Sequence, residues 1–368
     1  MTPSDDGASK DVRSEAVRPE IVRSAAGESG ADLPGRGLRI LAVTNMWPED
    51  GSFRGIFVRE QVDALRAHGA QVDVEVVAQA RGRRDYLLAA PRIRRRVQAG
   101  GYDLIHIHHG MCALACRFVG GVPRVLGLYG HDVNWHWQRL ITRLGWGGVA
   151  EKVYVSRRMA LAAGDPDGCV IPNGVDFDLF SPSDRGKARA DLGFTDADKV
   201  MLFGAVPDNW VKGYDVFSDV LELLRERGYP AKELILPSPG QTREGVRPKF
   251  TAADVLLFTS RRGFEGSPTV VKEATAIGLP VVTTDVGDVA EVLGGITPSA
   301  VVSFPEPWGS PETRSQLVTA LADQVAAVFD ANRRSNGREV NAWLAWDRIA
   351  GTVLDMYRQV LARSRSSR

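Results

Sequence analysis

The segment from Phe258 to Gly287 reads FTSRRGFEGSPTVVKEATAIGLPVVTTDVG, and it indicates the fold class more clearly than any other part of the chain. An apolar run, Ala253 to Phe258, leads into it and is typical of a strand buried on both faces of a parallel sheet. A second apolar run, Leu279 to Thr284, follows. The segment therefore predicts a strand, loop, helix, strand unit, which is the building block of α/β proteins.

The helix of this unit carries start and end signals. Ser267 is a favoured N-cap residue, and Pro268 suits the first helical position because its missing N–H group would have no helical partner there. Gly278 is expected to end the helix. The stripe that faces the core is expected to comprise Val270, Val271, Ala274 and Ile277.

Two carboxylates mark this unit as a candidate ligand site. Glu265 lies in the loop and Glu273 on the second helical turn, both near the carboxyl ends of the strands, where open α/β sheets bind ligands. The free amides at the helix start, those of residues 269 to 271, suit a phosphate group. The two glutamates are better suited to accept hydrogen bonds from hydroxyls, which a nucleotide sugar carries on both sides of its diphosphate. A surface glutamate and a helix-face glutamate with no function explain the same pattern equally well.

Composition narrows the class of protein. The chain has 368 residues, 44% hydrophobic and 25% charged, which is typical of a globular protein with room for two domains. Its net charge of +1 argues against a dedicated nucleic-acid binder. Three cysteines, Cys112, Cys116 and Cys169, are expected to be free thiols in a reducing compartment. The polar start of the chain resembles no signal peptide, and no apolar run of about 20 residues is present, so a cytoplasmic protein is expected.

The order of predicted elements indicates two α/β units. Strands are expected at 38–45, 72–77, 103–108, 124–128, 153–155 and 169–171, and again at 199–203, 233–236 and 301–303. Between the two series, PNGVDFDLFSP has the turn residues of a linker. We therefore expect a disordered arm at 1–36, a first domain at 37–172, a linker at 173–183, a second domain at 184–339 and a closing helical segment at 340–368.

The sequence lacks the motifs of several common kinds of binding and catalytic site. The chain has no glycine-rich dinucleotide fingerprint after a strand, no Walker loop and no nucleophile elbow. His106, His108 and His109 have no partner cluster at metal-ligand spacing. The Asp-x-Asp pairs at 165, 176 and 196 fall in predicted turns, where aspartate is common. We therefore expect no metal and no bound cofactor.

Two further residues are candidates for ligand contacts. His131 follows a predicted strand in LYGHD, where a neutral imidazole can donate a hydrogen bond to a sugar, although a packed structural histidine is nearly as good an explanation. Lys212 lies at the start of the second unit's first helix and can neutralise a diphosphate; an ordinary exposed lysine is the alternative. Trp135 and Trp137 offer stacking surfaces for a sugar, or are partly buried aromatic residues.

A basic segment in the first unit suggests a surface for anionic partners. Arg81 to Arg96 contains seven arginines with Ile93 between them. Such a segment can dock on anionic lipid headgroups or an acidic acceptor, each cation contributing about 1 kcal/mol. A solvated basic helix face is the default explanation.

The sequence also resembles a known family, the retaining GT-B glycosyltransferases of family four. EGSPTVVKEATAIGLPVVTTDVGDVAEVL is similar to the signature of this family, a glutamate followed by seven residues and Glu-Ala, then Gly-x-Pro-Val-Val. RILAVTNMWPEDGSFRGIFVREQVDAL resembles the first strand, glycine loop and first helix, and VIPNGVDFDLFSP resembles the crossover between the domains. The likeness covers almost the whole predicted folded chain, including a final helix with Trp346.

This resemblance implies an α/β GT-B fold, in which two Rossmann-like domains with parallel sheets face each other across a cleft. It implies transfer of a hexose or N-acetylhexosamine, with retention, from a nucleotide diphosphate sugar that is most often UDP-linked. The acceptor would be a hydroxyl of a lipid-linked, cell-envelope or small molecule. By matching positions, Glu273 would bind the ribose, Glu265 the sugar and Lys212 the diphosphate, while His131 would contact the sugar ring. The rest of the donor site would comprise Gly55, Gly266, Ser267, Thr269, Val270 and Val271.

The sequence departs from the family pattern in two places. Ala205 to Asp208 lacks the arginine that most relatives carry before the lysine, which leaves Arg261 or Arg262 as replacement candidates. The stretch between Leu236 and Thr251 is short, so the second sheet is expected to be small. Two alternative functions remain at this point: a nucleotide-sugar epimerase of GT-B fold, and a sugar-nucleotide binding protein without catalysis. The location expected from the sequence is cytoplasmic, with peripheral membrane contact through Arg81 to Arg96.

Overall fold

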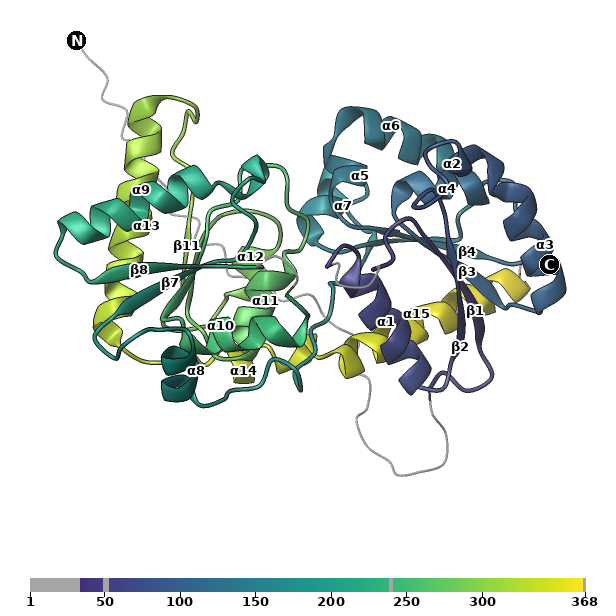
Figure 1. Cartoon of the computed structure of the whole chain (residues 1–368). Helices are drawn as coiled ribbons and strands as arrows, with labels where there is room; N and C mark the ends of the chain where they lie inside the picture. Colours follow the sequence, from purple (N-terminus) through teal and green to yellow (C-terminus); the bar gives the residue numbers. More distant parts are fainter. Residues whose placement is uncertain (1–33, 49–52, 238–240, 367–368) are drawn as a thin grey trace, which may run out of the picture.

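A computed structural model of the chain describes residues 34–48, 53–237 and 241–366. Two parallel sheets, each flanked by helices, form two domains that lie side by side (Figure 1). The predicted disordered arm falls mostly outside the described residues. The first sheet has six strands in the order β2-β1-β3-β4-β5-β6, with these bounds: β1 Arg39–Thr44, β2 Gln71–Val76, β3 Leu104–His108, β4 Arg124–Leu128, β5 Glu151–Tyr154 and β6 Cys169–Val170.

Helices cover both faces of the first sheet, as a parallel sheet requires. Apolar side chains of the strands alternate between two buried cores, one under α3 and α4 and the other under α1 and the last helix of the chain. The helices of this domain are α1 Ile56–Ala67, α2 Asp85–Leu88, α3 Ala90–Gly100, α4 Gly110–Cys116, α5 His131–Asn134, α6 His136–Gly145 and α7 Arg157–Ala163.

The second sheet has five strands in the order β11-β10-β9-β7-β8. The short stretch between Leu236 and Thr251 was predicted to be only a loop, and this is wrong, because its described residues contain a 3-10 turn and the start of a helix. The strands are β7 Lys199–Phe203, β8 Ala231–Ile235, β9 Val255–Phe258, β10 Val281–Thr284 and β11 Ala300–Val302. The helices and turns are α8 Arg185–Asp191, η1 Trp210–Lys212, α9 Tyr214–Glu226, η2 Glu244–Val246, α10 Arg247–Ala252, α11 Thr269–Ala276, α12 Val289–Val292, α13 Pro311–Ala331, α14 Gly337–Val340 and η3 Ala342–Leu344.

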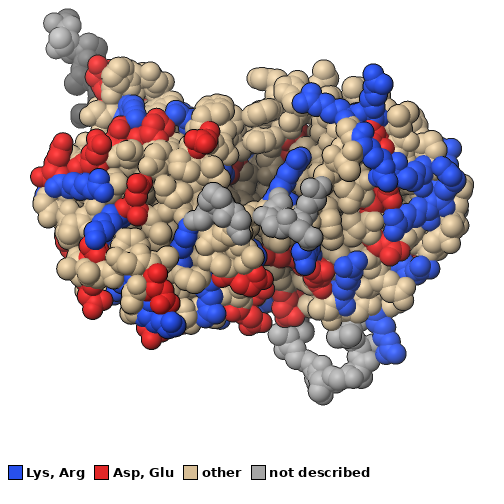
Figure 2. Space-filling view, viewed as in Figure 1, with Lys and Arg blue, Asp and Glu red and all other residues tan. Residues whose placement is uncertain are grey.

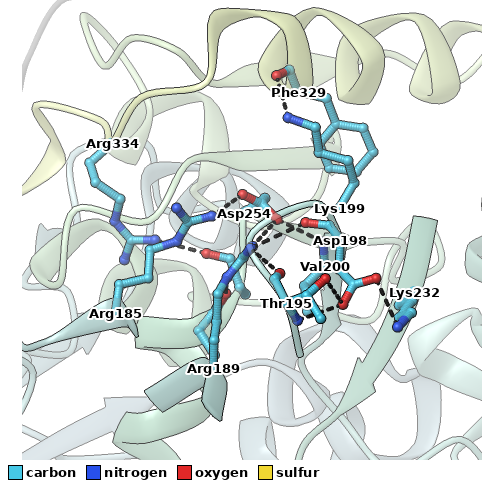
Figure 3. Close-up of polar contacts among 12 residues, drawn as sticks. Arg185, Arg189, Thr195, Asp198, Lys199, Val200, Lys232, Asp254, Phe329 and Arg334 are labelled. Atoms are coloured by element: carbon cyan, nitrogen blue, oxygen red, sulfur yellow. Dashed lines mark hydrogen bonds and ion pairs between the residues drawn. The ribbon is translucent and has the colours of Figure 1, made fainter. Parts of the chain in front are cut away.

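A buried polar network fixes the amino ends of the central strands in this domain (Figure 3). Asp254, just before β9, accepts from Arg189 Nη2 at 2.6 Å and from the amide of Val200 at 2.7 Å, and it also pairs with Arg185. Arg334, after α13, donates to the carbonyl of Ala253 at 2.9 Å. The network joins α8, β7, β9 and the end of α13, at the edge opposite the carboxyl ends where ligands are expected.

The last helix, α15 Trp346–Ser366, leaves the second domain and packs on the first sheet beside α1 (Figure 1). The chain thus crosses between the domains twice. The two crossings lie next to each other, because Val175 and Ala345 form a β-bridge in which the Val175 amide donates to Leu344 O at 2.9 Å. The closing helical segment predicted at 340–368 is interrupted at its start, because α14 ends at Val340 and η3 precedes the first residue of α15, Trp346.

The opening segment forms the predicted strand, loop, helix, strand unit, but the prediction of its cap was wrong. The helix α11 begins at Thr269 with the extended residue Pro268 at the N-cap and no side-chain cap. The Ser267 hydroxyl instead donates to Asp288 Oδ2 at 2.7 Å. The helix is also buried beyond its apolar stripe, because Lys272, Glu273 and Thr275 are buried while Val270 is only partly so.

Candidate active site

The loops that carry the predicted site residues meet between the two domains. A side-chain carbon on Gly266 would lie 2.2 Å from the carbonyl oxygen of Tyr129, so only glycine allows this approach of the two chains. A side-chain carbon on Gly130 would lie 3.6 Å from the amide nitrogen of Gly266. Figure 2 shows a hollow between the two halves of the molecule. His131 of the first domain and Glu265 of the second therefore lie at one cleft.

Lys212 and Glu265 form one cluster in the second domain. Lys212 Nζ lies 2.6 Å from Glu265 Oε1, and the hydroxyl of Ser260 donates to the same oxygen at 2.5 Å. The loop that carries the lysine is fixed because Thr259 Oγ1 donates to the carbonyls of Lys212 and Gly213, at 3.1 and 2.8 Å. The lysine and the carboxylate that the sequence singled out separately are thus direct partners.

His131 begins the short helix α5 and remains exposed at the cleft. Its ring stacks on Trp135, with 4.5 Å between centroids. Partial burial lowers the pKa of His131, and the Glu265 carboxylate opposes that effect. The imidazole is therefore neutral at pH 7 and can donate a hydrogen bond. His131 covers one face of the Trp135 indole, so a sugar could stack only on the other face.

Asp132, which the sequence reasoning missed, holds the backbone around His131 in place. Its buried carboxylate accepts from the amides of Tyr129, Gly130 and Gly110, at 3.1, 2.8 and 3.2 Å. Gly130 has φ 157, at the margin of the region that favours glycine. The signal available in the sequence was the Gly-His-Asp turn after a buried strand, where aspartate commonly binds backbone amides.

The start of α11, where an anion was predicted to bind, has no side-chain cap. The first amides, those of Thr269, Val270 and Val271, are therefore not used by a cap. Gly287, from the loop after β10, approaches this start: a side-chain carbon there would lie 2.9 Å from Gly266 O. Gly266 and Ser267 therefore lie in a tightly packed turn directly before the helix.

A fully buried lysine, Lys272, ties this helix to the crossover between the domains. Its ammonium group donates to Asn173 O at 3.2 Å and to Ser267 Oγ at 2.5 Å, and it lies 3.1 Å from Asp288 Oδ2. Burial lowers the pKa of Lys272, while Asp288 opposes that effect. Sequence reasoning missed this lysine because it expected only the apolar stripe of the helix to face the core.

Glu273 has a partner that the sequence did not predict. Arg243 Nη1 lies 2.7 Å from Glu273 Oε1, and Arg243 also pairs with Glu60 of α1 at 3.0 Å. The indole of Trp346 donates to the other oxygen of Glu60 at 3.0 Å. This group of four residues, Trp346, Glu60, Arg243 and Glu273, joins both domains at the predicted ribose carboxylate. We call it the Arg243 cluster.

Three further residues that the sequence suggested for the donor site are Gly55, Arg261 and Arg262. Gly55 has φ 75 and is the N-cap residue of α1. A side-chain carbon on Gly55 would lie 2.3 Å from the carbonyl oxygen of Met46, so the close approach that requires glycine here is to the loop after β1. Arg261 pairs with Asp215 at 2.9 Å, and Arg262 pairs with Glu306. Arg261 also donates to the carbonyl of Trp210 at 2.9 Å, so it lies beside the turn that carries Lys212 and stays a candidate to replace the missing arginine.

His106, His108, Cys112 and Cys116 are core residues of the first domain. His106 Nδ1 is 2.5 Å from the hydroxyl of Tyr357, and His108 Nδ1 is 2.7 Å from that of Tyr129. Burial lowers the pKa of His106 to about 3 and raises the pKa of Cys116 to about 12. In the described part of the chain, no group of three or more His, Cys, Asp or Glu residues is arranged to hold a metal ion.

The arginine-rich segment is only partly free for a partner. Arg92 pairs with Glu75 at 2.5 Å and with Asp85 at 3.1 Å, and Arg96 pairs with Glu75 at 2.7 Å. These two arginines therefore attach α3 to β2 within the domain. Other members of the segment, Arg81, Arg83, Arg84, Arg94 and Arg95, are exposed.

Comparison with known proteins identifies related sequences along most of the chain. The model of Glycosyltransferase Family 4 matches residues 31–179, and that of Glycosyl transferases group 1 matches residues 238–307. A D-inositol 3-phosphate glycosyltransferase from Actinosynnema mirum is 26% identical over 322 residues, covering 73% of this chain and 75% of the relative. The enzyme of the same name from Saccharomonospora viridis is 27% identical over 329 residues and covers 73% of each.

Solved structures share the fold. Sucrose-phosphate synthase from Thermosynechococcus elongatus matches with a TM-score of 0.65 at 17% identity, covering 89% of this chain and 100% of that one. Anabaena HepE in complex with UDP-glucose matches with a TM-score of 0.56 at 19% identity, covering 90% and 100%. Together, the two family matches, the relatives and the shared two-sheet architecture show that the chain belongs to the retaining glycosyltransferases of family 4, the group 1 glycosyl transferases of GT-B fold.

Proposed function

We propose that the protein transfers a hexose or N-acetylhexosamine, with retention, from a UDP-linked sugar to an acceptor hydroxyl. The observation that carries this proposal is the Lys212–Glu265 pair, which lies at the same cleft as the start of α11 and as His131. A cation and uncapped helix amides suit a diphosphate, and a carboxylate with a neutral imidazole suits sugar hydroxyls. Support for UDP comes from HepE, whose structures contain UDP and UDP-glucose.

In this proposal, stabilisation of the departing diphosphate is the main catalytic contribution. Lys212 and the amides of Thr269 to Val271 would bind the phosphate oxygens, where negative charge grows as the bond to the sugar breaks. Glu265 would then accept from a sugar hydroxyl through Oε2, since Lys212 and Ser260 both contact Oε1. His131 would donate to the sugar ring, and the backbone at Gly55, Gly266 and Ser267 would line the donor site. The diphosphate itself would take up the proton of the acceptor hydroxyl.

We further propose that the acceptor is a lipid-linked or cell-envelope glycan, reached by the enzyme at the cytoplasmic face of an anionic membrane. The support is an exposed apolar surface on α2, α6 and the turn after α4, which we call the α2/α6 surface. Both α2 and α6 pack on α4. Six of its side chains are between 54% and 72% exposed, namely Leu87, Leu88, Phe118, Trp137, Leu140 and Leu144.

Charge around the α2/α6 surface suits anionic headgroups. Arg94 donates to the carbonyl of Phe118 at 2.7 Å, and the guanidinium of Arg117 lies 5.6 Å from the Phe118 ring. Lys and Arg side chains are frequent on the upper and outer sides of this domain in Figure 2. The helix α6 also begins five residues after His131, so a lipid acceptor held at this surface would lie near the cleft. No described helix is long and apolar enough to cross a membrane.

The reaction is tested by incubating the protein with a panel of UDP-sugars, with and without a bacterial lipid extract, and measuring UDP release. Release that requires the extract, and that Lys212→Met suppresses, supports transfer. Isomerisation of the UDP-sugar in the absence of any acceptor would instead show an epimerase and would overturn the proposal.

Membrane docking is tested by cosedimentation with vesicles that contain anionic or only zwitterionic lipids. Replacing both Leu140 and Leu144 with serine should weaken binding about 100-fold, because each inserted leucine contributes at least about 1.5 kcal/mol. Leu161→Ser, which alters an exposed leucine on α7, is the control. Equal binding by all variants would exclude this surface and favour a small diffusible acceptor. Charge reversal of Arg92 or Arg96 is unsuitable, because it would break ion pairs within the domain.

A further inference from the structure

Arg243 lies between two carboxylates from different domains. It donates through Nε to Glu60 of α1 at 3.0 Å and pairs through Nη1 with Glu273 of α11 at 2.7 Å. Its guanidinium also lies 4.7 Å from the centre of the Phe180 ring, and its side chain is 14% exposed. The fork of an arginine can hold two acceptors in fixed directions, which a lysine cannot.

The charges of the Arg243 cluster show what the arginine does for Glu273. Glu60 and Glu273 are both largely buried and both acidic, and Arg243 is the cation that contacts them in the described structure. Burial raises the pKa of Glu60, Arg243 lowers it, and Glu273 raises it again. Without Arg243, two buried carboxylates would share one region of low dielectric, and such a pair takes up a proton.

The arginine does not exhaust the hydrogen-bonding capacity of Glu273. The ion pair uses Oε1, and an ionised carboxylate has several acceptor positions on its two oxygens. A ribose hydroxyl could therefore bond to Glu273 while Arg243 stays in place. A protonated Glu273, in contrast, would be a weaker acceptor for such a hydroxyl.

We propose that Arg243 is a positioning residue for the donor, which holds Glu273 as an oriented, charged acceptor for the ribose hydroxyls. Through Glu60, it also attaches this acceptor to α1 and to the first residue of α15. This inference rests on the proposed function, because it takes UDP as the nucleotide of the donor, and on the ribose contact that the family resemblance implies for Glu273. Arg243 acts through Glu273 and contacts neither the diphosphate nor the sugar.

The test compares two nucleotides that differ only at the ribose. Titration calorimetry measures binding of UDP and of 2′,3′-dideoxy-UDP to the parent protein, to Arg243→Met and to the conservative variant Arg243→Lys. The parent should prefer UDP by at least about tenfold, the value of one hydrogen bond to a charged group. In Arg243→Met, this preference should fall below about threefold at pH 6.5 and recover in part at pH 8.5, as the carboxylate pair loses its shared proton.

Matched variants separate this role from a merely structural one. Arg227→Met, which removes an arginine paired with Asp323 on the surface of the same domain, should keep the full preference. Glu60→Gln should also keep it, because Arg243 then remains with Glu273, and Arg243→Lys should keep it in part. If Arg243→Met fails to fold, these last two variants decide the question, and loss of the preference in Glu60→Gln would overturn the proposal.

The outcomes also separate this proposal from the function on which it rests. An equal loss of affinity for both nucleotides in Arg243→Met, at every pH, would overturn the role of Arg243 while leaving the donor site intact. A parent protein that binds both nucleotides equally would instead overturn the ribose contact of Glu273. In that case, the proposed donor site itself would need revision.

Discussion

Replacing Lys272 with methionine should destabilise the second domain strongly, although lysine and methionine have similar lengths. The lysine is fully buried, and its removal leaves Asp288, which is 5% exposed, without a cation. Asp288 Oδ2 would keep only the Ser267 hydroxyl, and Oδ1 has no hydrogen-bond partner within the described structure. Breaking one side of a buried ion pair costs about 3–5 kcal/mol. For a domain of this size, that corresponds to a melting point lower by roughly 6–20 °C.

Calorimetry of the parent and the variants checks this value. The double variant Lys272→Met with Asp288→Leu should recover most of the loss, because replacing a whole buried pair by apolar groups is close to neutral. Lys187→Met is the control, since Lys187 forms an exposed pair with Asp191 at 3.1 Å and should shift the melting point by no more than about 2 °C. The reasoning would be refuted if Lys272→Met behaved like this control, or if the double variant were less stable than the single one.

Three further predictions concern the cleft. Lys212→Met should lower kcat by about 100- to 1000-fold. The melting point should change little, because the Lys212 side chain is partly exposed and its ion pair therefore contributes little to stability. Steady-state kinetics and calorimetry together check this. The acid limb of the activity profile that is assigned to His131 should lie below pH 6.5, because burial lowers the pKa of this histidine. Glu265→Gln should move the limb to still lower pH, because it removes the charge that raises the pKa of His131. A profile of kcat/KM against pH with a limb above 6.5 would contradict this. Glu273→Ala should weaken UDP binding while changing the melting point by only a few degrees, since it leaves Arg243 paired with Glu60; a collapse of the melting point would show that Glu273 is mainly structural.

Local sequence patterns predicted the elements around the donor loop because those signals are themselves local. Two apolar runs and Gly278 were sufficient to place β9, α11 and β10. The N-cap prediction failed because Ser267 bonds to Asp288, 21 positions further along the chain, and this tertiary contact overrides the local preference. A single sequence contains no period or spacing that reports such a contact.

The site was predicted only in part, because some of its contacts follow from local signals and others join distant parts of the sequence. Lys212 and Glu265 were identified because each follows a strand of the second sheet, and parallel strands bring such loops together. Arg243 was missed because its partner Glu60 lies 183 positions away, and Lys272 because Asn173 lies 99 positions away. These long-range contacts, which join α11 to α1 and to the crossover, become visible only in the folded chain.

The two adjacent crossings at Val175 and Ala345 have a consequence for biosynthesis. A growing chain on the ribosome acquires the whole first sheet early, yet the side chains that cover one of its faces, including Ile349, Val353 and Tyr357, are translated after the entire second domain. Until then, α1 alone covers part of that face, and strand residues such as Ile40 and Val125 lack the α15 side chains of their core. The second domain is thus expected to fold while one face of the first sheet is still incompletely covered. A chain whose translation stalls before α15 is therefore expected to bind chaperones.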